Sequence, residues 1–515
     1  MGDLEIPAGE SRPEQGFSDI VVLGGGPAGV TAALRAAALG ASVTLIEADR
    51  LGGVCTDDGC APTRVLAHAA RLMREAGQYA AYGLAGRAPR LDFEQLMAQT
   101  QATVYRIHEK KQLAAQLEAA GVRVIEQLGP AHFVDGHTVE LASGARIGAQ
   151  RFILCVGGHA RRLSFPGSEL ALTHSDVWQL RTLPARLAIV GSAATGSQLA
   201  SIFAAFGSRV TLLELAPRIL PAEDELISDA MGAAFAEGGI SIQTGIGGLR
   251  SLKAVGQEQR LEYAVGEHPR SLEVDAVILA VGWTGNVEAL RLEACGVTTE
   301  RGYVSVGPDL RTTAEHVYAA GDVTGRMMLV QTAIADGRLA AEKAVGPQSQ
   351  NAVGAQSQYA DGEAGRSVVP HGGFTDPEYG SVGLTEKLAA QREPIAVGVV
   401  PYADLDRGFI DGRTVGAAKL VVSRATRRLL GAHVVGEQAV EVVQVVAAAM
   451  AAGLRVDELA QLRLAYPTYT AILGLAARDV LRQLDAGTGG SPHEWEWGDP
   501  ALPPRFRNDF GTAEG

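Results

Sequence analysis

Short apolar runs alternate with alanine-rich, helix-forming stretches along most of the chain. The first such block begins at Ser18, where the apolar run 19–23 leads into a glycine-rich turn, Gly24–Gly29. An alanine-rich stretch with helical character follows to about Leu39, and a second apolar run spans Ser42–Glu47. The order strand, tight turn, helix, strand predicts one βαβ unit.

The same order recurs much later in the chain. An apolar run, Leu187–Val190, leads into the turn Gly191–Gly196, a helical stretch to Phe206 and a further apolar run, Arg209–Glu214. Two βαβ units at such different places predict two dinucleotide-binding domains rather than one.

The C-terminal third has a different pattern. Strand-like runs (418–422 and 429–435) are followed by helical runs (440–452 and 469–484), which predicts a third domain of the α+β type. Three segments have compositions that bury little apolar surface, and we expect a lead, a linker and a tail there: 1–17, 345–368 and 485–515.

Composition excludes several classes of protein. The 515 residues carry a formal net charge of -13, which argues against nucleic acid or an anionic membrane as the main partner. No signal peptide and no apolar stretch of about 18 residues is visible, so we expect a cytoplasmic protein that does not bind membranes. The four cysteines are too few for a disulfide scaffold.

The first glycine turn has the spacing of a dinucleotide-binding fingerprint. Gly24 allows the turn, Gly26 lets the backbone approach a pyrophosphate, and Gly29 lets helix and strand pack closely. Glu47 ends the second strand, where a carboxylate accepts hydrogen bonds from a ribose. With both strands and the acid present, the motif is specific.

The second fingerprint departs from this pattern at one position. Gly191 and Gly196 are present, but Ala193 takes the place of the middle glycine, so we expect this nucleotide to lie slightly farther from the backbone. Glu214 would repel a 2′-phosphate, which favours NADH over NADPH.

Two arginines soften that preference. Arg209 and Arg218 lie close enough to Glu214 in the sequence to attract a phosphate, so NADP remains the less favoured alternative.

Two cysteines separated by four residues follow the first βαβ unit directly. In the segment Leu51–Arg64, Cys55 and Cys60 can be bridged if a helix begins irregularly there, and Pro62 suits a first helical turn. A thiol at a helix N-terminus has a lowered pKa and reacts as the thiolate. The alternatives are a zinc half-site and two inert buried thiols; no second Cys/His pair supports a metal.

Several motifs in sequence order resemble the class I pyridine nucleotide–disulfide oxidoreductases, the family of dihydrolipoamide dehydrogenase, glutathione reductase and mercuric reductase. The resemblance covers the chain from about Ser18 to Leu484. The segments that carry it are Gly52–Arg64, Val281–Asn286, Val317–Asp322 and Phe374–Thr385.

The resemblance implies an α/β fold: two Rossmann-like domains of the three-layer ββα type, for FAD and NAD(P), and an α+β domain that forms a homodimer. We expect the FAD domain at 18–160 and 285–344, the NAD(P) domain at 161–284, and the dimerisation domain at 369–484. The cofactor-binding residues so predicted are Gly24, Gly26, Gly29, Glu47, Gly53, Asp322, Gly191, Gly196, Glu214 and Gly282.

The resemblance also implies roles for the cysteines. Cys55 would be the interchange thiol that attacks the substrate, and Cys60 would lie against the flavin. NADH would deliver a hydride to the flavin, which would then reduce the disulfide.

At the C-terminus the chain departs from this family. Tyr466 and Ala471 replace the histidine and glutamate that move protons at the thiols. A tyrosine, with a pKa of about 10, is a poor base at neutral pH, so oxidation of a dithiol by the usual route is doubtful. Tyr466 resembles mercuric reductase, yet no cysteine follows Cys295.

Two further departures would lie beside the flavin. Arg64 and Gln198 replace a lysine and a glutamate that form an ion pair in the family. The expected catalytic residues are therefore Cys55, Cys60, Tyr466, Arg64 and Gln198.

The acids between the cysteines are open to two interpretations. Asp57 and Asp58 either raise the pKa of the interchange thiol or receive a cationic substrate, or they are simply solvated loop acids.

The leading functional hypothesis is an NAD(P)H-dependent FAD enzyme that acts on a thiol, a disulfide or a small thiol-reducible substrate. The alternatives are a flavin-direct enzyme (a quinone reductase, oxidase or transhydrogenase), a mercuric reductase-like metal reductase, and a redox sensor without catalysis.

Overall fold

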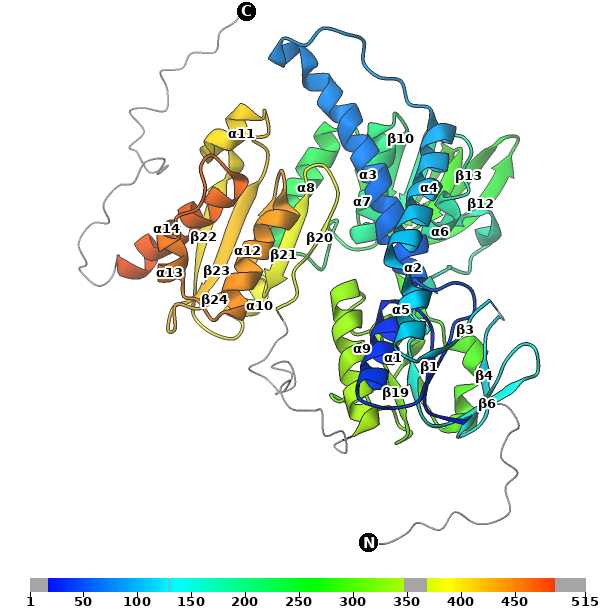
Figure 1. Cartoon of the computed structure of the whole chain (residues 1–515). Helices are drawn as coiled ribbons and strands as arrows, with labels where there is room; N and C mark the ends of the chain where they lie inside the picture. Colours follow the sequence, from blue (N-terminus) through cyan, green and yellow to red (C-terminus); the bar gives the residue numbers. More distant parts are fainter. Residues whose placement is uncertain (1–16, 128, 347–367, 487–515) are drawn as a thin grey trace, which may run out of the picture.

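A computed structural model describes residues 17–127, 129–346 and 368–486. The predicted lead, linker and tail lie almost wholly outside these residues. Figure 1 shows three parts: a first nucleotide domain at the lower right, a second above it, and a C-terminal domain at the left.

The first nucleotide domain is built on a sheet in the order β3-β2-β1-β6-β5-β4, with β19 also pairing with β6. Its strands are β1 (Phe17–Leu23), β2 (Val43–Ile46), β3 (Arg123–Ile125), β4 (His132–Asp135), β5 (Thr138–Glu140), β6 (Arg146–Leu154) and β19 (Val317–Ala319). Strands β1, β2, β3, β6 and β19 run parallel, as a βαβ unit requires.

Helices cover one face of this sheet. Helices α1 (Pro27–Ala38) and α9 (Val330–Val345) bury mainly alanines in the core shared with β1 and β2, and α5 (Leu113–Ala119) buries Leu117 there. Strand β1 is therefore apolar on both faces: Val22 packs under α1 and Val21 packs on the opposite side with Phe133.

The chain leaves and re-enters this domain through a pair of strands. Strands β7 (Gly158–Ala160) and β16 (Trp283–Gly285) pair antiparallel, and the second nucleotide domain lies between them in sequence.

The second nucleotide domain has three layers. Its parallel sheet has the order β11-β10-β9-β15-β8 and lies between helices and a three-stranded antiparallel sheet, β12-β13-β14. The bounds are β8 (Leu172–Thr173), α6 (His174–Val177), β9 (Arg186–Val190), α7 (Ala194–Ala205), β10 (Arg209–Leu213), α8 (Glu225–Glu237), β11 (Ser241–Gln243), β12 (Ile246–Val255), β13 (Glu258–Val265), β14 (His268–Val274) and β15 (Ala276–Leu279). The predicted ββα architecture is confirmed.

The C-terminal domain is an antiparallel sheet in the order β20-β21-β24-β23-β22, covered on one face by helices. The bounds are β20 (His371–Gly373), β21 (Tyr379–Gly383), α10 (Glu386–Ala390), β22 (Ile395–Pro401), α11 (Asp406–Ile410), β23 (Ala417–Ser423), β24 (Leu429–Val435), α12 (Ala439–Ala451), α13 (Val456–Gln461) and α14 (Ile472–Asp485). Its other face meets the second nucleotide domain, whose core includes Tyr379 and Val435.

A buried ion cluster joins these two domains. The Lys419 ammonium lies 2.7 Å from Asp224 and 2.6 Å from Glu386, and Asp224 is 2% exposed. Burial opposes the charge on Asp224, but hydrogen bonds from Lys419 and the Glu386 backbone outweigh it and lower the pKa of Asp224. The carboxylate thus stays ionised inside the interface.

Replacing the lysine should therefore be costly. We expect Lys419→Met to destabilise the protein by about 3–5 kcal/mol at pH 7, because Asp224 is left buried without the ammonium that balances its charge. Because the pKa of Asp224 is lowered in the folded protein, its ionised carboxylate stabilises the fold at pH values above its unfolded pKa of about 3.9. This stabilisation is lost as the pH falls through the lowered pKa of the folded protein. The difference in the free energy of unfolding between Lys419→Met and the parent should therefore become smaller as the pH falls through this range.

Urea unfolding followed by circular dichroism measures the effect. Lys253→Met is the matched control, because Lys253 is exposed and its nitrogen lies 3.6 Å from Glu262. Such a surface pair is worth about 1 kcal/mol or less. Equal effects of the two substitutions would contradict the importance of the buried cluster.

Candidate active site

The first glycine turn brings backbone into contact with backbone. An added Cβ on Gly29 would lie 1.8 Å from the Gly24 carbonyl oxygen, and one on Gly24 (φ +102°) would lie 2.3 Å from the Cys155 carbonyl oxygen. Gly26 is different, since its added Cβ would meet only the Gly53 Cα, at 3.8 Å. The space beside Gly26 suits a pyrophosphate at the start of α1.

The terminal acid is held by this turn. The Gly25 backbone N–H donates to Glu47 at 2.5 Å, and the Asp49 N–H donates to its other oxygen at 2.9 Å. Glu47 is thus fixed at the carboxyl end of β2, where a ribose diol would meet it.

The second turn repeats this geometry. An added Cβ on Gly196 would lie 1.8 Å from the Gly191 carbonyl oxygen. The Ser192 backbone N–H donates to Glu214 at 2.8 Å, as Gly25 does to Glu47. Ala193 takes the position of Gly26 and caps α7, so its methyl group stands where the first turn leaves space.

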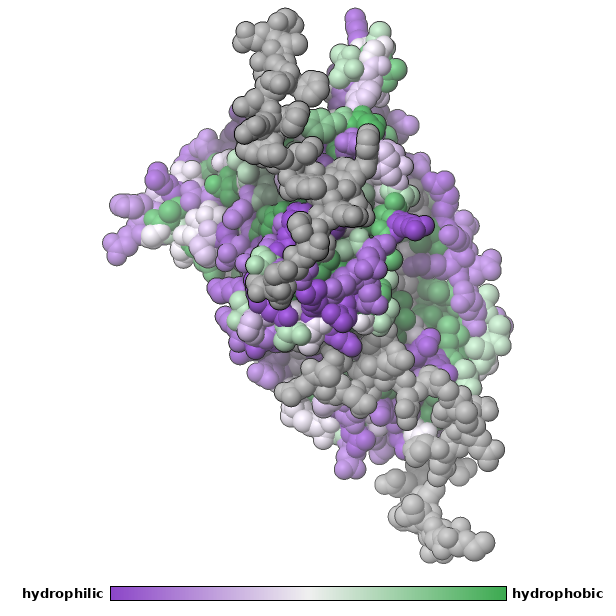
Figure 2. Space-filling model, turned by 90° about the vertical axis from the view of Figure 1, so that its left-hand side faces the viewer, coloured by the Kyte–Doolittle hydropathy of each residue, from purple (hydrophilic) through white to green (hydrophobic). Residues whose placement is uncertain are grey.

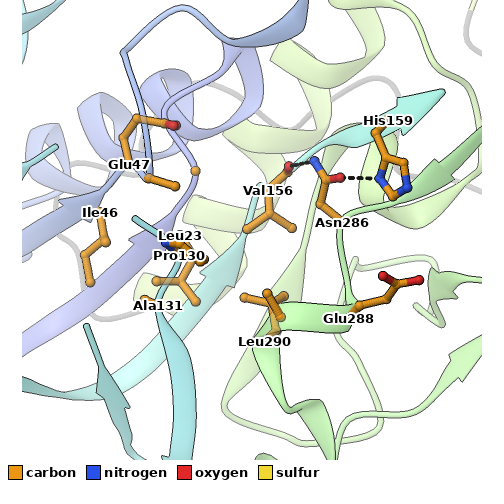
Figure 3. Close-up of a pocket in the computed structure, with 13 residues that line it drawn as sticks. Leu23, Ile46, Glu47, Pro130, Ala131, Val156, His159, Asn286, Glu288 and Leu290 are labelled. Atoms are coloured by element: carbon orange, nitrogen blue, oxygen red, sulfur yellow. Dashed lines mark hydrogen bonds between the residues drawn. The ribbon is translucent and has the colours of Figure 1, made fainter. Parts of the chain in front are cut away.

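A cavity of about 390 Å³ opens beside the first turn. Gly24 and Glu47 line it at one end, and Figure 3 shows His159 and Asn286 at the other. The Asn286 side chain links the two walls, donating to the Val156 carbonyl at 2.8 Å and pairing with His159 at 2.6 Å. This size and lining fit the adenosine half of a dinucleotide.

The two cysteines lie on either side of a break between helices. Cys55 is on α2 (Gly53–Asp57), and Cys60 is the first residue of α3 (Cys60–Glu75). An irregular helix start was the condition for bridging them, and it is present. Cys55 is half-buried and Cys60 is exposed.

The two thiols interact directly, and this interaction moves their pKa values in opposite directions. The Cys55 S–H donates to the Cys60 sulfur, which lowers the pKa of Cys60 to about 7 and raises the pKa of Cys55. Lys111 lowers both values, while Asp322 raises both. The reduced pair therefore holds its first negative charge on Cys60.

The acids between the cysteines are both paired, so the interpretation as solvated loop acids is wrong. Asp57 accepts from Arg50 at 2.7 Å and pairs with His108 at 2.5 Å. Asp58 accepts hydrogen bonds from Ser175 and Trp178 of the second nucleotide domain.

Three further predicted cofactor residues lie at element boundaries. Gly53 (φ +62°) starts α2, and its added Cβ would lie 2.8 Å from the Gly26 Cα. Burial raises the pKa of Asp322, which follows β19. Gly282 (φ +101°) precedes β16, and its carbonyl accepts from the Arg161 N–H at 2.9 Å.

Arg64 and Gln198 each contact the C-terminal domain. The Arg64 guanidinium lies over the Phe374 ring at 3.9 Å and 3.5 Å from Glu378. The Gln198 side-chain oxygen accepts from the Phe374 backbone N–H at 3.2 Å. Both side chains thus meet at the segment 374–378.

Tyr466 lies on the C-terminal domain and is 62% exposed. Its hydroxyl donates to Asp406 at the start of α11. Its predicted place at the thiols requires a second subunit.

Sequence reasoning missed several residues. His159 lines the cavity although no sequence motif includes it. The only local indication of a functional position is that it lies two residues after Gly157, just beyond the end of β6. His174, Ser175 and Trp178 reach the redox segment from more than 110 positions away, which no local pattern reveals.

Comparison with known proteins decides the family. The model described as "Pyridine nucleotide-disulphide oxidoreductase" matches residues 18–337, and that of its dimerisation domain matches 369–477. The chain belongs to this family.

Individual relatives agree. A dihydrolipoyl dehydrogenase of Thermus scotoductus is 34% identical, with 90% of this chain and 98% of the relative covered. A mercuric reductase of Bacillus cereus is 31% identical, with 89% of this chain and 70% of the relative covered. The HOCl-induced flavoprotein disulfide reductase RclA of Escherichia coli has a TM-score of 0.77 at 27% identity, covering 89% and 99%.

The chain is therefore an FAD-dependent NAD(P)H:disulfide oxidoreductase, and both cofactors predicted from the sequence are those of its family. Its C-terminal domain is the family's dimerisation domain, which supports a homodimer. Within the described residues, no helix combines the length and the apolar character needed to cross a bilayer.

The two glycine turns can be tested separately. We expect Gly29→Ala to lower the FAD content of the purified protein at least tenfold, because its Cβ would clash with the Gly24 carbonyl. Gly196→Ala should keep FAD and weaken NADH binding. Absorbance at the flavin band and NADH titration measure the two effects, and each variant serves as the control for the other.

The thiol pair predicts a pH dependence. In the reduced protein, alkylation of Cys60 should rise with pH and level off above a midpoint near 7, because only the thiolate reacts. Cys55→Ala removes the S–H donor and should move the midpoint toward about 8.5. Mass spectrometry of the Cys60 peptide after brief iodoacetamide treatment measures it; an unmoved midpoint would refute the hydrogen bond.

Proposed function

We propose that this enzyme uses NADH to reduce a disulfide, or a small oxidant that thiols can reduce, through Cys55 and Cys60. The observation that carries the proposal is the position of the two thiols at the α2–α3 break, where α2 begins at Gly53 in contact with Gly26 of the phosphate loop. Bound FAD supplies the electron path from the nicotinamide to the cysteines.

The difference in acidity supports distinct roles for the two thiols. The reduced pair starts with its proton on Cys55 and its negative charge on Cys60. Cys55 passes this proton to Cys60 as it attacks one sulfur of the substrate disulfide, and the first substrate thiolate leaves and takes a proton from solvent. Cys60 then attacks Cys55 in the mixed disulfide and gives its proton to the second departing thiolate, which leaves the Cys55–Cys60 disulfide. Two electrons and a proton, supplied by NADH when both cofactors are bound, would restore the starting pair.

The direction of the reaction follows from Tyr466. A phenol with a pKa of about 10 donates a hydrogen bond to a thiolate but does not accept a proton efficiently at pH 7. Reduction of the substrate needs proton donation to the leaving thiol, whereas oxidation of a dithiol needs a base. We therefore infer that the enzyme works as a reductase.

A homodimer completes the site in this proposal. Tyr466 of one subunit reaches the thiols of the other across the two-fold axis. Its exposure supports this, as do the exposed apolar side chains of Phe409, Ile410 and Val415 in the same domain. Figure 2, in which the left-hand side of Figure 1 with the C-terminal domain faces the viewer, shows hydrophobic groups (green) lying among hydrophilic ones (purple).

NADH is the proposed donor rather than NADPH. Glu214 is 8% exposed and accepts from the Ser192 and Ala216 backbone N–H groups, so its charge is fixed where a 2′-phosphate would bind. Arg218 donates through Nη2 to the Pro221 and Glu223 carbonyls, which turns that part of its guanidinium toward the backbone. A cytoplasmic location suits a reduced dithiol.

The flavin-direct alternative rests on a specific observation, the replacement of the histidine–glutamate pair by Tyr466 and Ala471. In that case quinones or dioxygen would be reduced without the cysteines. Metal reduction like that of mercuric reductase would proceed without a C-terminal cysteine pair, because no cysteine follows Cys295.

Cys55→Ser separates these functions. We expect a loss of more than about a hundredfold in disulfide-dependent NADH oxidation, because the attacking sulfur is gone, while NADH still bleaches the flavin. Acceptors to be screened are lipoamide, low-molecular-weight disulfides, quinones and Hg(II).

Cys295→Ser is the control, since Cys295 is buried away from the pair and donates to the Leu292 carbonyl as a serine also can. Full turnover of Cys55→Ser with a quinone as the best acceptor would establish the flavin-direct function instead.

A further inference from the structure

The two thiols belong to the FAD domain, but the helices that carry them pack against different parts of the molecule. Cys55 lies on α2, which is fixed to the FAD domain: the Gly52 N–H donates to the Gly25 carbonyl at 2.9 Å, and Gly53 lies against Gly26. Motion of the FAD domain therefore carries Cys55 with it.

The helix that begins at Cys60 packs against the nicotinamide domain. It begins α3, whose buried face (Leu66, Ala67 and Ala70) belongs to the same apolar core as Ile189 and Phe203. Figure 1 shows α3 running beside α7, away from the sheet of the FAD domain. Burial of that face gives α3 and the nicotinamide domain a common core.

Asp58, two residues before Cys60, adds a polar attachment to the same domain. Its carboxylate accepts from Ser175 Oγ at 2.6 Å and from Trp178 Nε1 at 2.6 Å, and its backbone carbonyl accepts from the same indole at 3.0 Å. His174 Nε2 lies 3.3 Å away and is itself buried, with its ring 4.5 Å from the ring of Trp283.

These contacts keep the carboxylate charged. Burial alone would raise the pKa of Asp58, but the hydrogen bonds from His174, Ser175 and Trp178 outweigh it and lower that pKa. Asp57 differs, because Arg50 precedes the redox segment and His108 lies in the last turn of α4 (Phe93–Lys111), at the other end of that helix from its residues in the core shared with the nicotinamide domain. Adjacent acids of equal charge thus face different parts of the molecule.

We propose that Asp58 is a positioning residue that couples the nicotinamide domain to the thiol pair, so that nucleotide binding there changes the reactivity of Cys60. This inference rests on the proposed use of the two cysteines. The hydrogen bond between the thiols depends steeply on the distance between their sulfurs. A small shift of the nicotinamide domain, passed through Asp58 and α3, changes that distance and hence the stability of the Cys60 thiolate.

The test compares three variants of the full-length FAD-loaded protein, reduced with dithiothreitol and then freed of it. Alkylation of Cys60 is followed against pH with and without ADP-ribose, a redox-inert part of NADH. The parent midpoint should lie near 7 and move by at least half a pH unit when ADP-ribose binds. In Asp58→Ala, alkylation at pH 6 should change several-fold and the response to ADP-ribose should vanish.

Asp57→Ala is the matched control, because it removes the same charge one residue away and should keep the response to ADP-ribose. The groups that act on the charge of Cys60 (Cys55, Lys111 and Asp322) are unchanged in every variant. Trp178→Phe keeps the carboxylate and removes one hydrogen bond to it and one to the Asp58 backbone carbonyl, so it should reproduce the effect in part, even if Asp58→Ala folds poorly.

The proposal is overturned if ADP-ribose leaves the parent profile unmoved, or if Asp57→Ala and Asp58→Ala behave alike. Failure of the proposed function would give a different result: Cys55→Ser would still oxidise NADH with a disulfide at the rate of the parent. The two failures are therefore distinguishable.

Discussion

The close approach of backbone to backbone in the two glycine turns is the constraint on which the other parts depend. At Gly29 and Gly196 a helix begins so near the preceding strand that no side chain fits. This contact points the first N–H groups of α1 and α7 at the place of a pyrophosphate. The first turn also leaves space at Gly26 in which Gly53 lies. This contact places α2, and Cys55 on it, next to the first nucleotide site.

The interface between the nicotinamide and dimerisation domains is built by a different principle. Apolar packing of Tyr379 and Val435 is combined with buried charges around Lys419, and neither charge is stable there without the other. The segment 374–378 extends this interface to Arg64 and Gln198. The residues that replace the family's ion pair therefore contact the dimerisation domain, and each does so at Phe374.

Much of this architecture follows from local sequence. The strand–turn–helix–strand order at Gly24 and Gly191 specifies both nucleotide domains, because strand periodicity, glycine spacing and a terminal acid are short-range properties. The alternation in the C-terminal third likewise predicts the antiparallel sheet and its helices. An irregular helix start is the condition that the sequence sets for bridging Cys55 and Cys60, and the break between α2 and α3 meets it.

Contacts between distant segments could not be predicted in this way. The sequence shows Asp58 as an acid in a loop, but its partners Ser175 and Trp178 are known only when the nicotinamide domain is placed. The same holds for Arg64, whose neighbour Glu378 is more than 300 positions away. His159 joins the cavity because β7 and β16 pair, which is a property of the chain crossing between domains rather than of any motif.

The two remaining cysteines have a practical consequence. Cys155 and Cys295 are each 5% exposed, and burial raises the pKa of Cys155 and raises that of Cys295 to about 11. Both are thus chemically silent at neutral pH, beside a pair built to react. A fluorophore or spin label directed at thiols will attach at the redox centre of the natural protein, without removal of background cysteines, and report on it alone.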